Sequence, residues 1–184
     1  KLRKIEDFEE CFENGADKIV INTSLLINPK LIIDASKVFG SQSIIGSIDV
    51  KKINNEYIVF TKNGSFNTKV NLKGYLELEH IKYLGEIYLN SIDKDGTGQG
   101  YDTNILKTAE TIVSCPIILA GGAGQSNHFS NALASSNVDA LATANLFNFI
   151  GSGLETVRNS LTSSNFLFPN WDPSYLNDIK NNYL

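Results

Sequence analysis

Two carboxylates and three glycines follow an apolar run near the middle of the chain. The run Ile87–Ile92 has the composition of a strand that is buried on both faces. The residues that come directly after it are polar or flexible: Asp93, Asp95, Gly96, Gly98 and Gly100. Asp102 then stands where we expect the N-cap of a helix over Ile105–Ile112. Because ligands bind at the carboxyl ends of parallel strands, this pattern is typical of a catalytic loop between a strand and a helix.

Four other short apolar runs end in the same way. Each stops at a polar or glycine residue and is followed by a helical stretch: Lys18–Asn22, Ser43–Asp49, Pro116–Ala120 and Ala140–Ala144. Short links join most of these segments. The order predicts five repeated βα units in an α/β fold with a parallel sheet. Periodicity alone is compatible with either a doubly wound sheet or part of a barrel.

Other readings of the acidic and glycine-rich loops fail on spacing. An EF-hand loop that began at Asp93 needs Glu at position 12, where the chain has Asn104. The three glycines after Asp95 lack the dinucleotide-binding spacing, and Gly121–Gly124 lacks the lysine of a P-loop. His80 and His128 fall on expected helices away from any Cys/His cluster, so we expect no metal and no cofactor.

The composition limits the class of protein. The chain has 184 residues, 42% of them hydrophobic and 20% charged, with a net charge of −4. These values are typical of a soluble globular protein, and no long basic run suggests a nucleic acid partner. No apolar stretch approaches the roughly 20 residues that span a bilayer. Cys11 and Cys115 form no motif, which favours two free thiols in the cytoplasm.

The remaining segments set the expected scaffold. We expect helices over five further ranges: Ile5–Asn14, Leu31–Phe39, Leu72–Leu84, Ser126–Ala134 and Leu154–Leu161. Asn28 and Pro29 form a typical helix start. Residues 51–68 interrupt the pattern, and Asn54-Asn55 between alternating runs predicts an inserted hairpin. From about residue 165 we expect an irregular tail.

Several motifs in fixed order identify a family resemblance. They are Ala-Asp-Lys-x-x-Ile-Asn-Thr (16–23), Phe-Gly-Ser-Gln (39–42), Ser-Ile-Asp-Val-Lys (47–51), Ser-Ile-Asp-Lys-Asp-Gly-Thr (91–97), Gly-Tyr-Asp (100–102) and Gly-Gly-Ala-Gly (121–124). Together they resemble the cyclase subunit of imidazole glycerol phosphate synthase, a (β/α)8 TIM barrel of histidine biosynthesis. The resemblance covers about residues 1–150. It implies that 1–184 is a single partial barrel domain with about the last five βα units, because a TIM barrel runs to about 250 residues.

The resemblance also implies an activity. In that family a lyase/cyclase uses ammonia from a glutaminase partner to convert a ribulosyl aminoimidazole carboxamide ribonucleotide, which carries a phosphate at each end, into imidazole glycerol phosphate. By motif position, Asp49 resembles one of two catalytic aspartates, and proton transfer suits such a carboxylate. The other catalytic aspartate would lie N-terminal to this chain.

The family also implies binding residues at the same strand ends. Asn22 and Thr23 resemble residues that contact the substrate. Glycines let phosphate oxygens approach the backbone, and the matching positions are Gly96, Gly121 and Gly122, with Asp95 and Asn145 beside them. Two departures lie near the second phosphate: Ala120 and Asn145 stand where the family usually has serine.

Charged residues at the opposite, N-terminal strand ends resemble a contact with the partner. Asp17, Lys18 and Glu86 match the docking aspartate and two members of a charged gate over the ammonia passage. Two alternatives stay open. Ser47–Lys52 and Asn90 also resemble a paralogous branch that delivers ammonia to a sugar nucleotide in surface-polysaccharide synthesis. The second alternative is a non-catalytic subunit that binds phosphosugars or activates a glutaminase.

Overall fold

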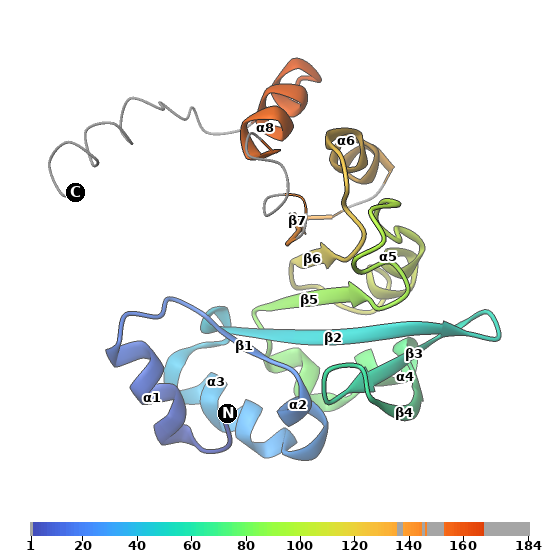
Figure 1. The fold of residues 1–184 in the computed structure, drawn as a ribbon. Helices are drawn as coiled ribbons and strands as arrows, with labels where there is room; N and C mark the ends of the chain where they lie inside the picture. The colour runs from blue at the N-terminus through green and yellow to red at the C-terminus, as the bar shows by residue number, and fades with distance from the viewer. Residues whose placement is uncertain (1, 136–137, 145, 147–152, 168–184) are drawn as a thin grey trace, which may run out of the picture.

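The centre of the molecule is a sheet of parallel strands that neighbour one another in chain order (Figure 1). The computed structural model describes residues 2–135, 138–144, 146 and 153–167. Five parallel strands lie in these ranges, as predicted: β1 (Ile19–Ile21), β2 (Ile44–Ile53), β5 (Glu86–Ser91), β6 (Ile117–Ala120) and β7 (Ala140–Ala142). Because neighbours in space are also neighbours in sequence, the strands form one curved wall rather than a doubly wound sheet.

The two faces of this wall differ in polarity. Along the strands, alternate side chains such as Ile21, Ile48 and Leu89 are buried in one hydrophobic cluster with the helices. Their neighbours point to the opposite face, where Val20 keeps 54% of its surface exposed. The ladder sets Asp49 of β2 opposite Asn90 of β5. Since directly paired residues share a face, both side chains lie on the side away from the main helical core.

Helices follow the strands at most of the predicted places. Those among the described residues are α1 (Ile5–Glu13), α2 (Thr23–Ile27), α3 (Pro29–Phe39), α4 (Leu72–Leu76), α5 (Asn104–Ala109), α6 (Ser126–Ser135) and α8 (Gly153–Ser163). As predicted, Pro29 is the first residue of α3, where its missing N–H costs no hydrogen bond. Gly15, just beyond α1, has a φ of 92°, a conformation that suits a residue without Cβ.

Two helix predictions need correction. The segment Leu72–Leu84 is not one helix: α4 ends at Leu76, Leu78 is extended, and a short 3₁₀ helix covers Glu79–Tyr83. In a continuous helix Ile81 would lie about two and a half turns from Leu72 and point away from the core; the break lets both be buried. The N-cap of α5 is Thr103, not Asp102, although the Asp102 carboxylate does accept a hydrogen bond from the Asn104 N–H (3.2 Å).

The predicted insertion is present as an antiparallel hairpin at the end of β2. It consists of β3 (Glu56–Thr61) and β4 (Phe66–Asn71). Asn54 and Asn55 make the tight turn from β2 into β3 with φ values of 49° and 67°, which is why asparagine suits this position. The hairpin lies beside the C-terminal part of β2 (Figure 1). It therefore borders the strand ends at which Asp49 and Asn22 stand.

Candidate active site

Asp49 lies at the centre of the candidate site, held by two asparagines from the neighbouring strands. The Nδ2 of Asn22, just after β1, donates to one carboxylate oxygen of Asp49 (Oδ2, 2.8 Å). The Nδ2 of Asn90, on β5, donates to the other (Oδ1, 3.0 Å). The structure thus brings together two residues that the sequence predicts, Asp49 and Asn22. It adds Asn90 as a direct partner.

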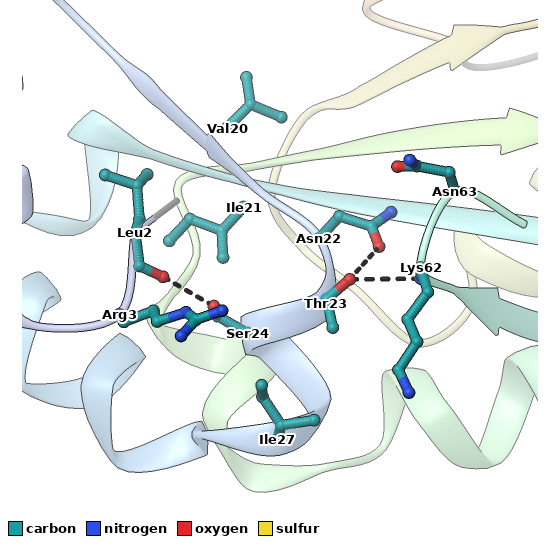
Figure 2. Close-up of a pocket in the computed structure, with 10 residues that line it drawn as sticks. All are labelled: Leu2, Arg3, Val20, Ile21, Asn22, Thr23, Ser24, Ile27, Lys62 and Asn63. Carbon is teal, nitrogen blue, oxygen red and sulfur yellow. Dashed lines mark hydrogen bonds between the residues drawn. The ribbon is translucent and has the colours of Figure 1, made fainter. Parts of the chain in front are cut away.

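Three adjoining cavities open along this row of strand ends. The first, which we call the Thr23 cavity, has a volume of about 650 Å³ and is lined by Asn22, Thr23 and Ser24 with Arg3, Lys62 and apolar side chains (Figure 2). The second, the Asp49 cavity, has about 400 Å³ and is lined by Asp49, Asn63, Gly64, Asn90, Ile92 and Asp95. The third, the Gly121 cavity, has about 130 Å³ and is lined by Tyr88, Asn90, Asp95, Gly96, Gly121, Gly122, Ala123, Ala142, Thr143 and Ala144.

These cavities share lining residues and therefore lie next to one another. Asn63 lines the first and the second, while Asn90 and Asp95 line the second and the third. A long ligand could thus extend from the end of β1 past Asp49 to the loop after β6. Asn22, Thr23, Asp95 and the glycines Gly96, Gly121 and Gly122, which the sequence predicts as binding residues, all line one or another of these cavities.

The cavities differ in the charge of the residues that line them. The Thr23 cavity is bordered by the cations Arg3 and Lys62, and its lining contains no acidic residue. Thr23 accepts a hydrogen bond from the Lys62 backbone N–H (3.3 Å), which ties the hairpin tip to this end of the site (Figure 2). The middle of the row carries Asp49 and Asp95 instead. The Thr23 cavity is thus suited to an anionic group.

The Gly121 cavity offers backbone donors rather than cations. No residue in the described part of the chain accepts a hydrogen bond from the N–H groups of Gly96, Gly121 or Gly122. Such free backbone amides in a glycine-rich loop are a common way to bind a phosphate. Asn145, the other residue predicted here, lies outside the described residues, and Ala120 is buried.

Glycine at position 122 also has a packing reason that the sequence did not indicate. Gly122 has a φ of 104°, and a Cβ there would lie 2.2 Å from the carbonyl oxygen of Gly100. That carbonyl belongs to the loop after β5, and the Gly100 N–H in turn donates to the Gly122 carbonyl (2.7 Å). The missing side chain therefore leaves room for the neighbouring loop, and the phosphate contact of Gly122 stays a prediction.

Tyr88 is a further polar group that the sequence did not suggest. Its side chain lines the Gly121 cavity. Burial raises the pKa of its hydroxyl, and the negative charges of Asp95 and Asp49 raise it further. At neutral pH Tyr88 is thus a hydrogen-bond donor close to both carboxylates. The spacing Tyr88-x-Asn90 on a strand could have indicated a shared face.

The charged residues at the other strand ends are only partly brought together. Lys18 and Glu86 form an ion pair across the N-terminal ends of β1 and β5. Asp17 is exposed and makes no ion pair with a described residue. No group of three or more His, Cys, Asp or Glu side chains in the described ranges could hold a metal ion. Nor does any helix there have the length and apolar character needed to cross a membrane.

Comparisons with known proteins agree with this arrangement. Residues 2–150 match the model of a family described as "Histidine biosynthesis protein". The chain is 41% identical over 157 residues to a putative imidazole glycerol phosphate synthase subunit hisF2 of Parasynechococcus marenigrum, which covers 85% of this chain and 58% of that protein. It is 45% identical over 133 residues to imidazole glycerol phosphate synthase subunit HisF of Sulfurisphaera tokodaii, covering 72% and 53%.

A third relative has similar coverage. The chain is 40% identical over 148 residues to the HisF subunit of a Thermotoga species, covering 79% of this chain and 58% of that protein. The chain thus spans a little over half the length of these relatives. The family has the (β/α)8 barrel fold, and the five parallel strands, in chain order, form an arc of such a barrel. This chain belongs to the histidine biosynthesis protein family, with HisF subunits as its relatives.

Proposed function

We propose that this chain carries active-site residues of the cyclase subunit of an imidazole glycerol phosphate synthase. The observation that carries the proposal is the Asp49 carboxylate, held at the end of β2 by Asn22 and Asn90 between two cavities suited to anions. The names of the HisF relatives support the same activity. The reaction would be the use of ammonia to form imidazole glycerol phosphate.

The row of cavities supports a long substrate with an anion at each end. One phosphate would bind in the Thr23 cavity, near Arg3 and Lys62. The other would bind in the Gly121 cavity, where backbone N–H groups are free. The reacting middle of the molecule would then lie in the Asp49 cavity. A ribulosyl aminoimidazole carboxamide ribonucleotide with two phosphates has this distribution of charge.

Asp49, in the middle cavity, and Tyr88, in the adjoining Gly121 cavity, could supply proton chemistry. Asp49 can accept a proton from, or return one to, a group on the substrate. Tyr88, which stays protonated at neutral pH, can donate a hydrogen bond beside it. Ammonia would come from a glutaminase partner docked at the opposite strand ends, where Lys18 pairs with Glu86.

The test is turnover with ammonium salts by the protein that carries this chain. Asp49→Asn keeps the shape of the side chain and removes its proton chemistry, so we expect kcat to fall about 10²–10⁴-fold. Substrate affinity, measured by calorimetry, should stay within a few fold. Asp34→Asn, on α3 away from the three cavities, is the matched control.

Three results would count against the proposal. Near-normal turnover by the Asp49→Asn variant would remove Asp49 from the mechanism. Turnover of a sugar nucleotide in place of the ribonucleotide would assign the chain to the polysaccharide branch instead. Binding of the bisphosphate without any turnover by the unaltered protein would leave a non-catalytic phosphosugar-binding subunit.

A further inference from the structure

Asn90 contacts the Asp49 carboxylate from the neighbouring strand. The two residues are direct partners in the ladder between β2 and β5, so their side chains leave the sheet on the same face. Asn90 donates from Nδ2 to Oδ1 of Asp49, and Asn22 donates from Nδ2 to Oδ2 of Asp49. Each oxygen of one carboxylate therefore accepts a hydrogen bond from a carboxamide.

The other end of the Asn90 side chain is also confined. A Cβ on Gly121 would lie 2.9 Å from Oδ1 of Asn90 and 2.8 Å from the Ser91 carbonyl oxygen. Glycine at this position therefore leaves the room in which the carboxamide lies. Asn90 lines both the Asp49 cavity and the Gly121 cavity, so its side chain lies between Asp49 and the loop that contains Gly121.

We propose that Asn90 is a positioning residue that, together with Asn22, fixes the orientation of the Asp49 carboxylate toward the Asp49 cavity. A carboxamide N–H can bond only to an acceptor, and a protonated oxygen is a poorer one. A proton that arrives on Asp49 must therefore weaken one of the two bonds. The consequence for catalysis rests on the proposed function: Asp49 enters the reaction as a proton acceptor.

The Asp49 cavity contains a second carboxylate. Asp95, from the loop after β5, lines the same cavity as Asp49. The other titratable group close to both carboxylates is Tyr88 on β5. Lys62, at the hairpin tip, lines the neighbouring Thr23 cavity, and its Nζ lies 4.9 Å from the centre of the Phe66 ring. Among the described residues no ion pair reaches Asp49, so its hydrogen bonds come from neutral amides.

The test follows the carboxyl carbon of Asp49 by NMR as the pH is lowered, in the protein that carries this chain and in its Asn90→Leu variant. Leucine is similar in size and has no donor. A hydrogen bond from Asn90 favours the charged carboxylate, so we expect Asp49 to take up its proton at a higher pH in the variant than in the unaltered protein. Asn104→Leu, an exposed change on α5, is the control and should leave the curve in place.

A second variant guards against a folding defect in the first. Asn90→Asp is nearly identical in shape but sets a second carboxylate at hydrogen-bond distance from Asp49. The pair should then take up protons in two separate steps, the first of them well above the single step of the unaltered chain. Superimposable curves for the unaltered chain and either Asn90 variant would overturn the positioning role.

Kinetics separate this inference from the proposed function. If the protein turns over the ribonucleotide, Asn90→Leu should lower kcat more than it raises KM and move the acidic side of the kcat profile to higher pH. A purely structural defect would lower kcat equally at all pH values, which would also overturn the role. Because the NMR measurement needs no turnover, an inactive protein with a shifted Asp49 curve would refute the proposed function alone.

Discussion

At the scale of single residues, the carboxylates at the strand ends divide into two kinds. Asp49 and Asp95 line the cavities, whereas Asp93 and Asp102 hold loops together. Asp93 accepts a hydrogen bond from the Lys52 backbone N–H (2.7 Å), and Asp102 accepts one from the Tyr57 hydroxyl. Sequence position does not separate the two kinds, because Asp93, Asp95 and Asp102 all lie in the same loop after β5. Their hydrogen-bond partners do.

His80 provides a prediction about stability at this scale. It is 5% exposed, and no described residue bonds to its Nε2. Burial lowers the pKa of the imidazole below its usual 6.5, against a smaller opposing effect of the Leu25 backbone. Below pH 6.5 the unfolded chain therefore binds more protons than the folded one. The free energy of unfolding should be unaffected by His80 above this pH and should fall as the pH is lowered from 6.5 towards 5.

Urea unfolding at a series of pH values measures this effect. In His80→Leu, which cannot titrate, the decrease between pH 6.5 and 5 should become smaller. The aspartates and glutamates contribute mainly below this range. A decrease of the same size in the variant would assign the effect to another group.

At the scale of elements, the β3–β4 hairpin forms a fixed wall of the site. Its tip is tied to Thr23 through the Lys62 N–H, and its first strand is tied to the loop after β5. In that second contact the Tyr57 hydroxyl lies 2.9 and 3.0 Å from the two oxygens of Asp102. Burial and the Asp102 charge raise the pKa of Tyr57, so the hydroxyl remains a donor throughout the neutral range.

Removal of the Tyr57 hydroxyl should destabilise the packing of the β3–β4 hairpin. We expect Tyr57→Phe to lower the free energy of unfolding by about 1 kcal/mol. It should also speed amide hydrogen exchange in β3 and β4 more than in β5. Tyr83→Phe is the matched control, since the Tyr83 hydroxyl makes no hydrogen bond with a described residue. Equal exchange rates in both variants would mean that other contacts hold the hairpin.

At the scale of the whole molecule, two polar regions lie at opposite ends of the same strands. The carboxyl ends of the strands border the three cavities around Asp49. The amino ends of β1 and β5 carry the Lys18–Glu86 ion pair. Ser47 and Tyr88 lie between them on the same face of the sheet. In the proposed enzyme, ammonia would travel along this face from the partner to the substrate.

Lys18→Ala in the protein that carries this chain tests the coupling of the two ends. Turnover with ammonium salts should remain within about twofold of normal, because Asp49 and its cavities lie at the other strand ends. Turnover with glutamine and the glutaminase partner should fall by about an order of magnitude, because the side chain is removed from the proposed gate. An equal loss in both assays would indicate destabilisation, and no loss would leave the pair as ordinary surface charges.

Much of the scaffold was predictable from the order of residues alone. Apolar runs of strand length, each followed by a helical stretch, are local patterns, and Asn54-Asn55 and Pro29 act within a few residues of themselves. The prediction of one helix over Leu72–Leu84 was wrong because the burial of Ile81 depends on packing against the core. The local pattern of apolar residues carries no information about that packing. Asp49, Asn22 and Thr23 could be named as candidate site residues because strand ends and family motifs coincide there.

What the tertiary structure alone decided is which groups meet. Asn22, Asp49 and Asn90 are separated by 27 and 41 positions in the chain, and only the parallel register sets both carboxamides against one carboxylate. The same holds for Gly122, whose conformation depends on the backbone of Gly100. The sequence by itself determined which residue types stand at the strand ends, because that pattern is local. The contacts among them depend on how neighbouring strands align, and these contacts make Asn90 a partner of Asp49.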